Sequence, residues 1–321
     1  MKNTIIQRSL KIRSDFKAMI FKVLMNKILK SVFLVIFLLT VFLIIEKNSV
    51  FAEITPKQNS TNVSQIVKNE KTLDLRLLTE KGEFKISIPY SKLLFHVTEK
   101  KSTNTKDNTY RLTLKPELSQ FYEKIGNFKN QKKTVVVYPV FTQAAYDDYG
   151  FYSYYNKNCD TKCLTVRLPH ESKLGHHIGA NAVVAFGLLN YSFITDIDID
   201  TNPSILKKYD KVILLHNEYV TKKEFVSITN HSNVVYMYPN ALYAEVKTDY
   251  NKDTLTLVRG HGYPTSDVSN GFNWKFDNSK YEFDLNCTDW KFYQVKNGKM
   301  LNCYPSYKIL VDSKLLEEIT K

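Results

Sequence analysis

The chain has 321 residues, of which 43% are hydrophobic and 24% charged, a composition typical of globular proteins rather than disordered ones. Only ten residues are glycine, and neither of the nucleotide-binding motifs GxGxxG and GxxxxGK[ST] occurs. The net charge of +13 comes largely from the first 52 residues, and the remaining basic residues are scattered, so the sequence predicts no nucleic-acid partner.

An apolar run near the amino terminus predicts export. Residues 32–45 are apolar apart from one threonine, and Lys27 and Lys30 precede them. We expect residues 1–52 to contain a secretory signal that begins at Met25 and is cleaved after Ala52. The alternative is an uncleaved helix that anchors the protein in the membrane, although the run is short for a span. Either way, the rest of the chain is expected to be extracellular or at the cell surface.

The four cysteines agree with an oxidising compartment. Their spacing predicts two short-range disulfides, Cys159–Cys163 and Cys287–Cys303. The alternative for the first pair is a zinc site completed by downstream histidines, although the spacing matches no standard zinc motif. Those histidines are His170, His176 and His177.

The pattern along the body of the chain predicts three parts. Residues 53–70 are polar and aperiodic, which is typical of a linker. Residues 71–130 contain period-two apolar runs, such as Leu73, Leu75 and Leu77, and are expected to form a small antiparallel β segment. Residues 131–250 alternate strand and helix patterns, and residues 251–321 are expected to be a β-rich extension closed by the second disulfide.

The alternating region predicts an α/β fold with a doubly wound, mostly parallel sheet flanked by antiparallel β segments. The expected elements are strands at 134–142, 163–168, 192–199, 211–216 and 234–238, and helices at 180–190, from 203, and at 221–230. In the extension, strand-like patterns occur at 254–260, 281–285, 291–295 and 307–311.

The candidate site is the segment His216-Asn217-Glu218-Tyr219. It follows the apolar run Val212–Leu215, which is typical of a strand buried on both faces. Ligands of open α/β sheets bind beyond the carboxyl ends of the strands. An imidazole and a carboxylate at this position therefore indicate a metal or acid–base site, with core packing and helix capping as the alternative roles.

Three motifs in this region resemble a known family. They are Thr142-Gln143-Ala144-Ala145-Tyr146, then Thr195-Asp196 before His216-Asn217-Glu218-Tyr219, and then Pro239-Asn240-Ala241-Leu242-Tyr243. In order and approximate spacing they are similar to motifs of the N,N-dimethylformamidase large (β) subunit family, over about residues 134–247. The resemblance implies a class I glutamine-amidotransferase-like fold.

The resemblance also implies a site. Enzymes of that family hydrolyse an amide with an iron ion held by two tyrosines and a glutamate. Carried over by motif, Tyr146 and Glu218 become metal ligands and His216 a nearby base. His170 stands where the second tyrosine is expected, so the implied ligand set is Tyr146, His170 and Glu218, which suits iron or zinc.

Two functions follow from these patterns. The one we favour from the sequence is a non-enzymatic surface protein that kept the fold and binds a small molecule, peptide or glycan. The alternative is a metal-dependent hydrolase of an amide-like C–N bond, with His216 and Glu218 as its catalytic residues. A glycine-flanked turn at 259–263, an alternating acidic run at 196–200 and the tyrosine-rich segment 146–157 are weaker candidates.

Overall fold

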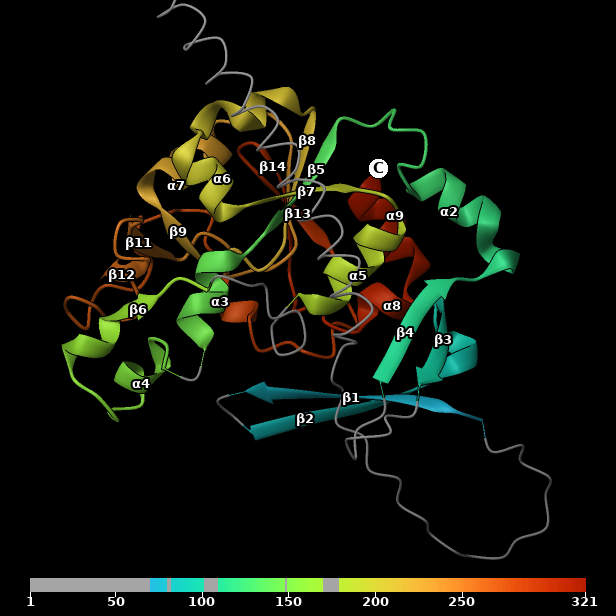
Figure 1. Ribbon diagram of the computed structural model, residues 1–321, viewed down its shortest axis with the longest axis horizontal. Coiled ribbons are helices and arrows are strands. Elements are labelled where there is room, and N and C mark those ends of the chain that lie inside the picture. Colours follow the sequence, from blue (N-terminus) through green and yellow to red (C-terminus); the bar gives the residue numbers. More distant parts are fainter. Residues whose placement is uncertain (1–69, 80–81, 101–108, 148, 170–178) are drawn as a thin grey trace, which may run out of the picture. The chain divides into compact units, whose positions relative to one another are not determined.

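The computed structural model describes residues 70–79, 82–100, 109–147, 149–169 and 179–321 (Figure 1). The expected signal or anchor, the linker and His170 lie outside these residues. In the described part of the chain, no helix is long and apolar enough to cross a membrane.

A six-stranded sheet lies at the centre of the fold. Four of its strands come from the predicted α/β region 131–250 and two from the predicted extension, whereas the strand expected at 163–168 belongs to a second sheet. Its order is β13-β14-β10-β8-β5-β7, and every neighbouring pair is parallel except β13 with β14. The strands are β5 (Thr134–Tyr138), β7 (Ser192–Thr195), β8 (Lys211–Leu214), β10 (Val234–Tyr236), β13 (Phe292–Val295) and β14 (Gly298–Leu301).

Helices cover both faces of this sheet. Alternate residues of a strand point to opposite faces, and Val136 and Ile213 enter one hydrophobic cluster while Val137 and Leu214 enter another. The first cluster is closed by α2 (Ser119–Ile125), α5 (Ala180–Leu188), α8 (Lys308–Val311) and α9 (Ser313–Thr320). The second is closed by α6 (Asp196–Thr201), η4 (Pro203–Lys208) and α7 (Lys222–Thr229) (Figure 1). The doubly wound prediction is confirmed at this level.

The amino-terminal β segment forms two hairpins. They are β1 (Thr72–Thr79) with β2 (Gly82–Pro89), and β3 (Phe95–Lys100) with β4 (Thr109–Leu114), followed by the short turns η1 (Tyr90–Lys92) and η2 (Pro116–Leu118). Their buried residues Leu75, Phe95 and Val97 belong to the same cluster as α5 and α9. The hairpins therefore share a core with one face of the central sheet.

A second sheet carries the candidate site. Its order is β6-β12-β11-β9, with β9 parallel to β11 and the other pairs antiparallel. Its strands are β6 (Thr165–Arg167), β9 (Tyr219–Thr221), β11 (Ala244–Asp249) and β12 (Thr254–Arg259), and it packs beside α3 (Val140–Tyr146), α4 (Tyr152–Tyr155) and η3 (Thr161–Leu164) (Figure 1).

Two predicted strands end earlier than expected, and helices follow. The strand predicted to reach Thr142 stops at Tyr138, because Pro139 lacks an N–H group for the ladder, and α3 begins at Val140. The strand predicted to reach Ile199 stops at Thr195, which caps α6 in a reciprocal capping box with Asp198. The acidic run is consequently helical, and its side chains do not alternate along a strand.

The prediction of a β-rich carboxyl-terminal extension is partly wrong. No strand forms at 281–285, which follow η5 (Ser279–Tyr281), and residues 308–311 form α8 instead of a strand. Strand β14 joins the edge of the central sheet beside β10, so this region completes the α/β core. Both predicted disulfides form, Cys159–Cys163 and Cys287–Cys303, which agrees with an oxidising environment.

Candidate functional site

The site lies where β8 ends and the chain crosses to β9. His216, Asn217 and Glu218 connect the two strands, and all three side chains are fully buried. The backbone of this connection is held from α3, since the Thr142 hydroxyl accepts the N–H groups of Glu218 at 3.0 Å and Tyr219 at 3.2 Å. The polar segment predicted to be a site is therefore an ordered element inside the fold.

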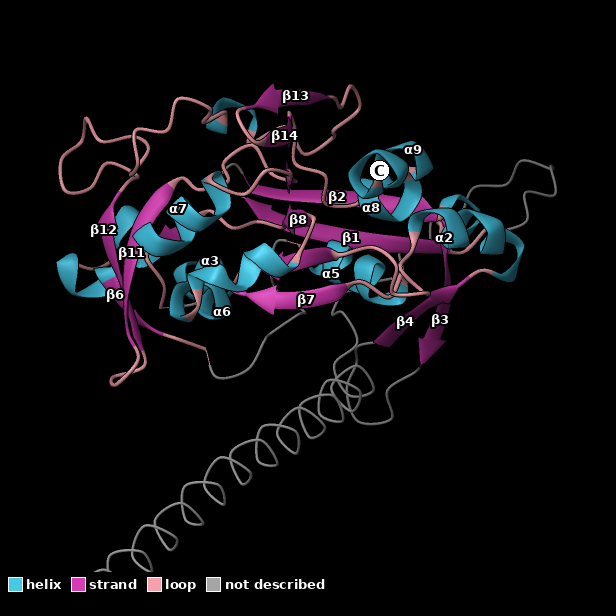
Figure 2. Ribbon diagram, turned by 90° about the horizontal axis from the view of Figure 1, so that it is seen from above, coloured by secondary structure: helices cyan, strands magenta, loops and turns pink. Residues whose placement is uncertain are grey.

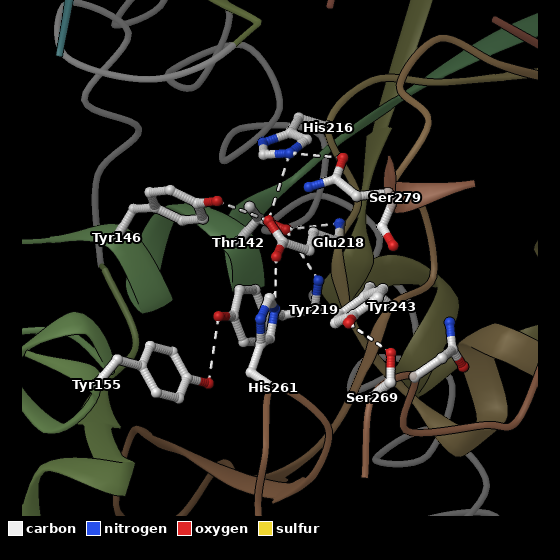
Figure 3. Close-up of polar contacts among 12 residues, drawn as sticks. Thr142, Tyr146, Tyr155, His216, Glu218, Tyr219, Tyr243, His261, Ser269 and Ser279 are labelled. Atoms are coloured by element: carbon white, nitrogen blue, oxygen red, sulfur yellow. Dashed lines mark hydrogen bonds and ion pairs between the residues drawn. The ribbon is translucent and has the colours of Figure 1, made fainter. Parts of the chain in front are cut away.

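Glu218 is the centre of the arrangement (Figure 3). The phenol of Tyr146 donates a hydrogen bond to Oε2 of Glu218 at 2.8 Å, and Nε2 of His261 lies 2.6 Å from Oε1. Nε2 of His216 lies 3.3 Å from Oε2. Three polar groups from α3, the strand connection and the turn after β12 thus meet at one carboxylate.

The charge of Glu218 is set by opposing effects. Burial alone raises the pKa of a carboxyl group, but the hydrogen bond and charge of His261 outweigh it, with help from His216 and Tyr146. The pKa of Glu218 consequently lies below its usual value, and the residue is a carboxylate near neutral pH. Burial and this negative charge together raise the pKa of the Tyr146 phenol well above its usual value.

His216 is held as a neutral imidazole. Burial lowers its pKa to about 4, although Glu218 and Asn240 favour the charged form. Its Nε2 faces two oxygens, Oε2 of Glu218 and Oδ1 of Asn240 at 3.1 Å, so the proton belongs on Nε2. Nδ1 then carries the lone pair, and it has no hydrogen-bond partner among the described residues.

His261 is the main residue that the sequence reasoning undervalued. It lies in the turn at 259–263, where Gly260, His261 and Gly262 all have positive φ. Its ring stacks on Tyr219 with centroids 5.4 Å apart, and its side chain is 20% exposed. The flanking glycines were the available signal, because they permit the left-handed backbone that turns the imidazole toward Glu218.

Tyrosine rings surround this centre. Tyr152 packs on Tyr146 with centroids 4.6 Å apart, and Tyr155 and Tyr243 contact His261 at 5.4 Å and 4.5 Å. Tyr152 and Tyr155 belong to α4, within the tyrosine-rich segment. The first disulfide, Cys159–Cys163, lies just beyond that helix in sequence.

The structure brings together most of the predicted residues that it describes. Tyr146, His216 and Glu218 meet as the resemblance implies, whereas His170 lies outside the described residues. Across the described ranges, no group of three or more His, Cys, Asp or Glu side chains is placed to hold a metal ion, so the acidic run of α6 is not a cation site. The phenol of Tyr146 beside Glu218 is a further possible ligand, of a residue type outside those four.

Comparisons with known proteins add no family assignment. No protein-family model matches the chain, and a search of curated proteins finds no significant match.

Proposed function

We propose that this protein is an exported, metal-dependent hydrolase of an amide-like C–N bond. The observation that supports it most is the convergence of Tyr146 and His261 on the buried carboxylate of Glu218. A non-enzymatic protein that had lost the site is expected to keep these side chains apart. Tyr146 and Glu218 instead touch, although 72 positions separate them in the sequence.

The donor set fits a hard or borderline cation. A phenol, a carboxylate and an imidazole are ligands that suit Fe³⁺, and the imidazole also suits zinc. Tyr146, Glu218 and His261 would hold the ion, which would take the place of the protons that now lie between these side chains. When bound, the metal would polarise the amide carbonyl and lower the pKa of a bound water.

His216 has the properties of the general base. It is neutral near pH 7, and its Nδ1, which has no partner among the described residues, carries the lone pair that would accept a proton. Asn240 and Glu218 fix the opposite nitrogen as the protonated one, which orients the ring. The role of Asn240 resembles that of residues that fix the tautomer of catalytic histidines.

The proposed family is that of the N,N-dimethylformamidase large subunit, with a class I glutamine-amidotransferase-like fold. The ordered motifs, the doubly wound central sheet and the contact between Tyr146 and Glu218 support this relationship. The two disulfides and the apolar amino-terminal run support export.

One observation favours a second candidate, a surface protein that binds ligands without turnover. Tyr149 is 89% exposed, and Tyr152, Tyr154 and Tyr155 on the following helix are partly exposed. Aromatic side chains of this kind pack on apolar faces of sugars, peptides and small molecules. Such a protein needs no metal and no proton transfer.

Hydrolysis of small N-alkyl amides by protein loaded with iron or zinc distinguishes these functions. We expect wild-type protein to release amine, and Glu218→Gln to release it at least about 100-fold more slowly, since one carboxylate ligand is lost. Glu317→Gln is the matched control, because Glu317 only pairs with Lys124 at the surface. Equal rates in wild type and Glu218→Gln, or no amine release from any amide, contradict the proposed hydrolase.

A further inference from the structure

A buried carboxylate outside the proposed ligand set connects the parts of the site. Asp196 is the first residue of α6 and is fully buried. Its Oδ2 accepts the backbone N–H of Phe141 at 2.8 Å, and its Oδ1 accepts the side-chain amide of Asn217 at 2.5 Å. One carboxylate therefore binds the first turn of α3 and the connection between β8 and β9.

Both partners of Asp196 belong to segments that carry site residues. Phe141 precedes Thr142 and lies on the same helix as Tyr146, and Asn217 stands between His216 and Glu218. The helices α3 and α6 lie next to each other (Figure 2). Because Thr142 in turn accepts the N–H groups of Glu218 and Tyr219, a shift of α3 would change the contact between Tyr146 and Glu218.

We propose that Asp196 is the positioning residue of this site, and that its carboxylate fixes α3 against the 216–218 connection so that Tyr146 meets Glu218. The importance of this role rests on the proposed function, but the hydrogen bonds of Asp196 do not depend on a metal. Its two oxygens accept one donor each, and a side chain of similar size without an acceptor, such as leucine, would leave both donors without a partner.

The surroundings of Asp196 preserve this arrangement. Glu224 of α7 is also fully buried, and burial, with the nearby charge of Asp196, raises its pKa well above its usual value. Burial also raises the pKa of Asp196, to about 7, so the two neighbouring carboxyl groups disfavour a second negative charge, and a proton on Glu224 leaves Asp196 as the acceptor. The carboxylate of Asp200, one turn further along α6, accepts hydrogen bonds from the hydroxyl groups of Thr221, Thr248 and Tyr250.

The test compares a broken and a restored pair. In Asp196→Leu, both donors lose their acceptor. In the double variant Asp196→Asn/Asn217→Asp, the new amide oxygen accepts from Phe141, and the new amide donates to the carboxylate at 217, so both hydrogen bonds return. Asp200→Asn is the matched control, because it neutralises a buried carboxylate of the same helix that does not touch the site.

The readout is amide hydrogen exchange at Glu218 and Tyr219, whose N–H groups bond to Thr142. We expect Asp196→Leu to accelerate exchange at these two amides at least about tenfold relative to the β8 amides. The double variant should return it to within about threefold of wild type, and Asp200→Asn should leave it unchanged. A global loss of stability would accelerate exchange in β8 as well. It would also not explain why the double variant restores slow exchange.

Unchanged exchange at Glu218 and Tyr219 in Asp196→Leu, or no rescue in the double variant, overturns the inference. Iron or zinc uptake is measured on the same proteins. If exchange follows the expected pattern but wild type takes up neither metal, the positioning role of Asp196 stands and the proposed hydrolase fails. If wild type and Asp196→Leu take up metal equally well and their exchange is the same, the proposed metal site stands and the positioning role fails.

Discussion

The phenol of Tyr146 donates a hydrogen bond to the carboxylate of Glu218 over 2.8 Å. Tyr146 is the last residue of α3, and Glu218 lies between β8 and β9, so the contact joins two elements that follow different strands of the central sheet. Each residue was selected from the sequence by a separate motif. Their meeting is what the proposed family relationship requires of them.

Removing the Tyr146 hydroxyl tests how much the contact matters. In Tyr146→Phe, Glu218 loses a donor inside the fold, which is expected to lower the free energy of unfolding by about 1–3 kcal/mol. Tyr149→Phe is the matched control and is expected to change it by less than about 0.5 kcal/mol, because Tyr149 is 89% exposed. Urea unfolding of the three proteins measures this, and equal loss in both variants would contradict the role of the contact.

The buried state of His216 predicts a pH dependence. Its pKa is about 4 in the folded protein and 6.5 as the ordinary value, so between these values the unfolded chain binds a proton that the folded protein does not. Stability from this residue is therefore complete above about pH 6.5 and is lost as the pH falls toward 4.

We measure this effect as a difference between variants, since Asp196, whose pKa burial raises to about 7, titrates in the opposite sense. From pH 7 to pH 4.5, wild type should lose roughly 2–3 kcal/mol of stability relative to His216→Gln. His96→Gln, at an exposed histidine, is the control and should follow the wild-type curve. Parallel curves for wild type and His216→Gln would show that His216 is not held neutral.

Two glycines with opposite surroundings test the turn that carries His261. Gly260 has φ +129, and an added Cβ would lie 2.9 Å from Cβ of Ala244, so Gly260→Ala is expected to lose at least about 1 kcal/mol. Gly187 in α5 has no neighbour within 4 Å of an added Cβ, and Gly187→Ala should gain about 0.5–1 kcal/mol. Thermal unfolding compares them, and a neutral Gly260→Ala would mean that the turn is not constrained.

The two disulfides should contribute unequally. They close loops with sequence separations of 4 for Cys159–Cys163 and 16 for Cys287–Cys303. Loop-closure entropy then predicts that replacing both cysteines by serine costs about 2 kcal/mol for the first pair and about 3 kcal/mol for the second. Denaturant unfolding under non-reducing conditions measures the two losses of stability. A larger loss for the first pair would contradict the prediction.

Much of the fold could be predicted from the sequence because its signals are local. Apolar runs such as Val212–Leu214 belong to strands buried on both faces, and Thr221, where the predicted helix 221–230 begins, caps α7. The strand ends were less predictable. Thr195 is compatible with a strand, and only its capping contact with Asp198 starts a helix there. Similarly, residues 308–311 have a strand-like composition, but they form a helix that packs in the same cluster as α5.

The site could be predicted only in part, for a different reason. His216 and Glu218 belong to one continuous motif, and Tyr146 was found through the resemblance. His261 follows Glu218 by 43 positions in a turn, and its contact with the carboxylate arises from long-range packing of β12 against β11. Asp196 was noticed in an acidic run, but its two bonds to Phe141 and Asn217 depend on the position of α6.

Elemental analysis of the purified protein tests the central claim most directly. The account predicts about one iron or zinc ion per chain in wild type and in Glu317→Gln, and a loss of that ion in Glu218→Ala. Wild-type protein that contains no metal after purification and after incubation with iron or zinc would contradict the account. A metal content that Glu218→Ala leaves unchanged would contradict it equally.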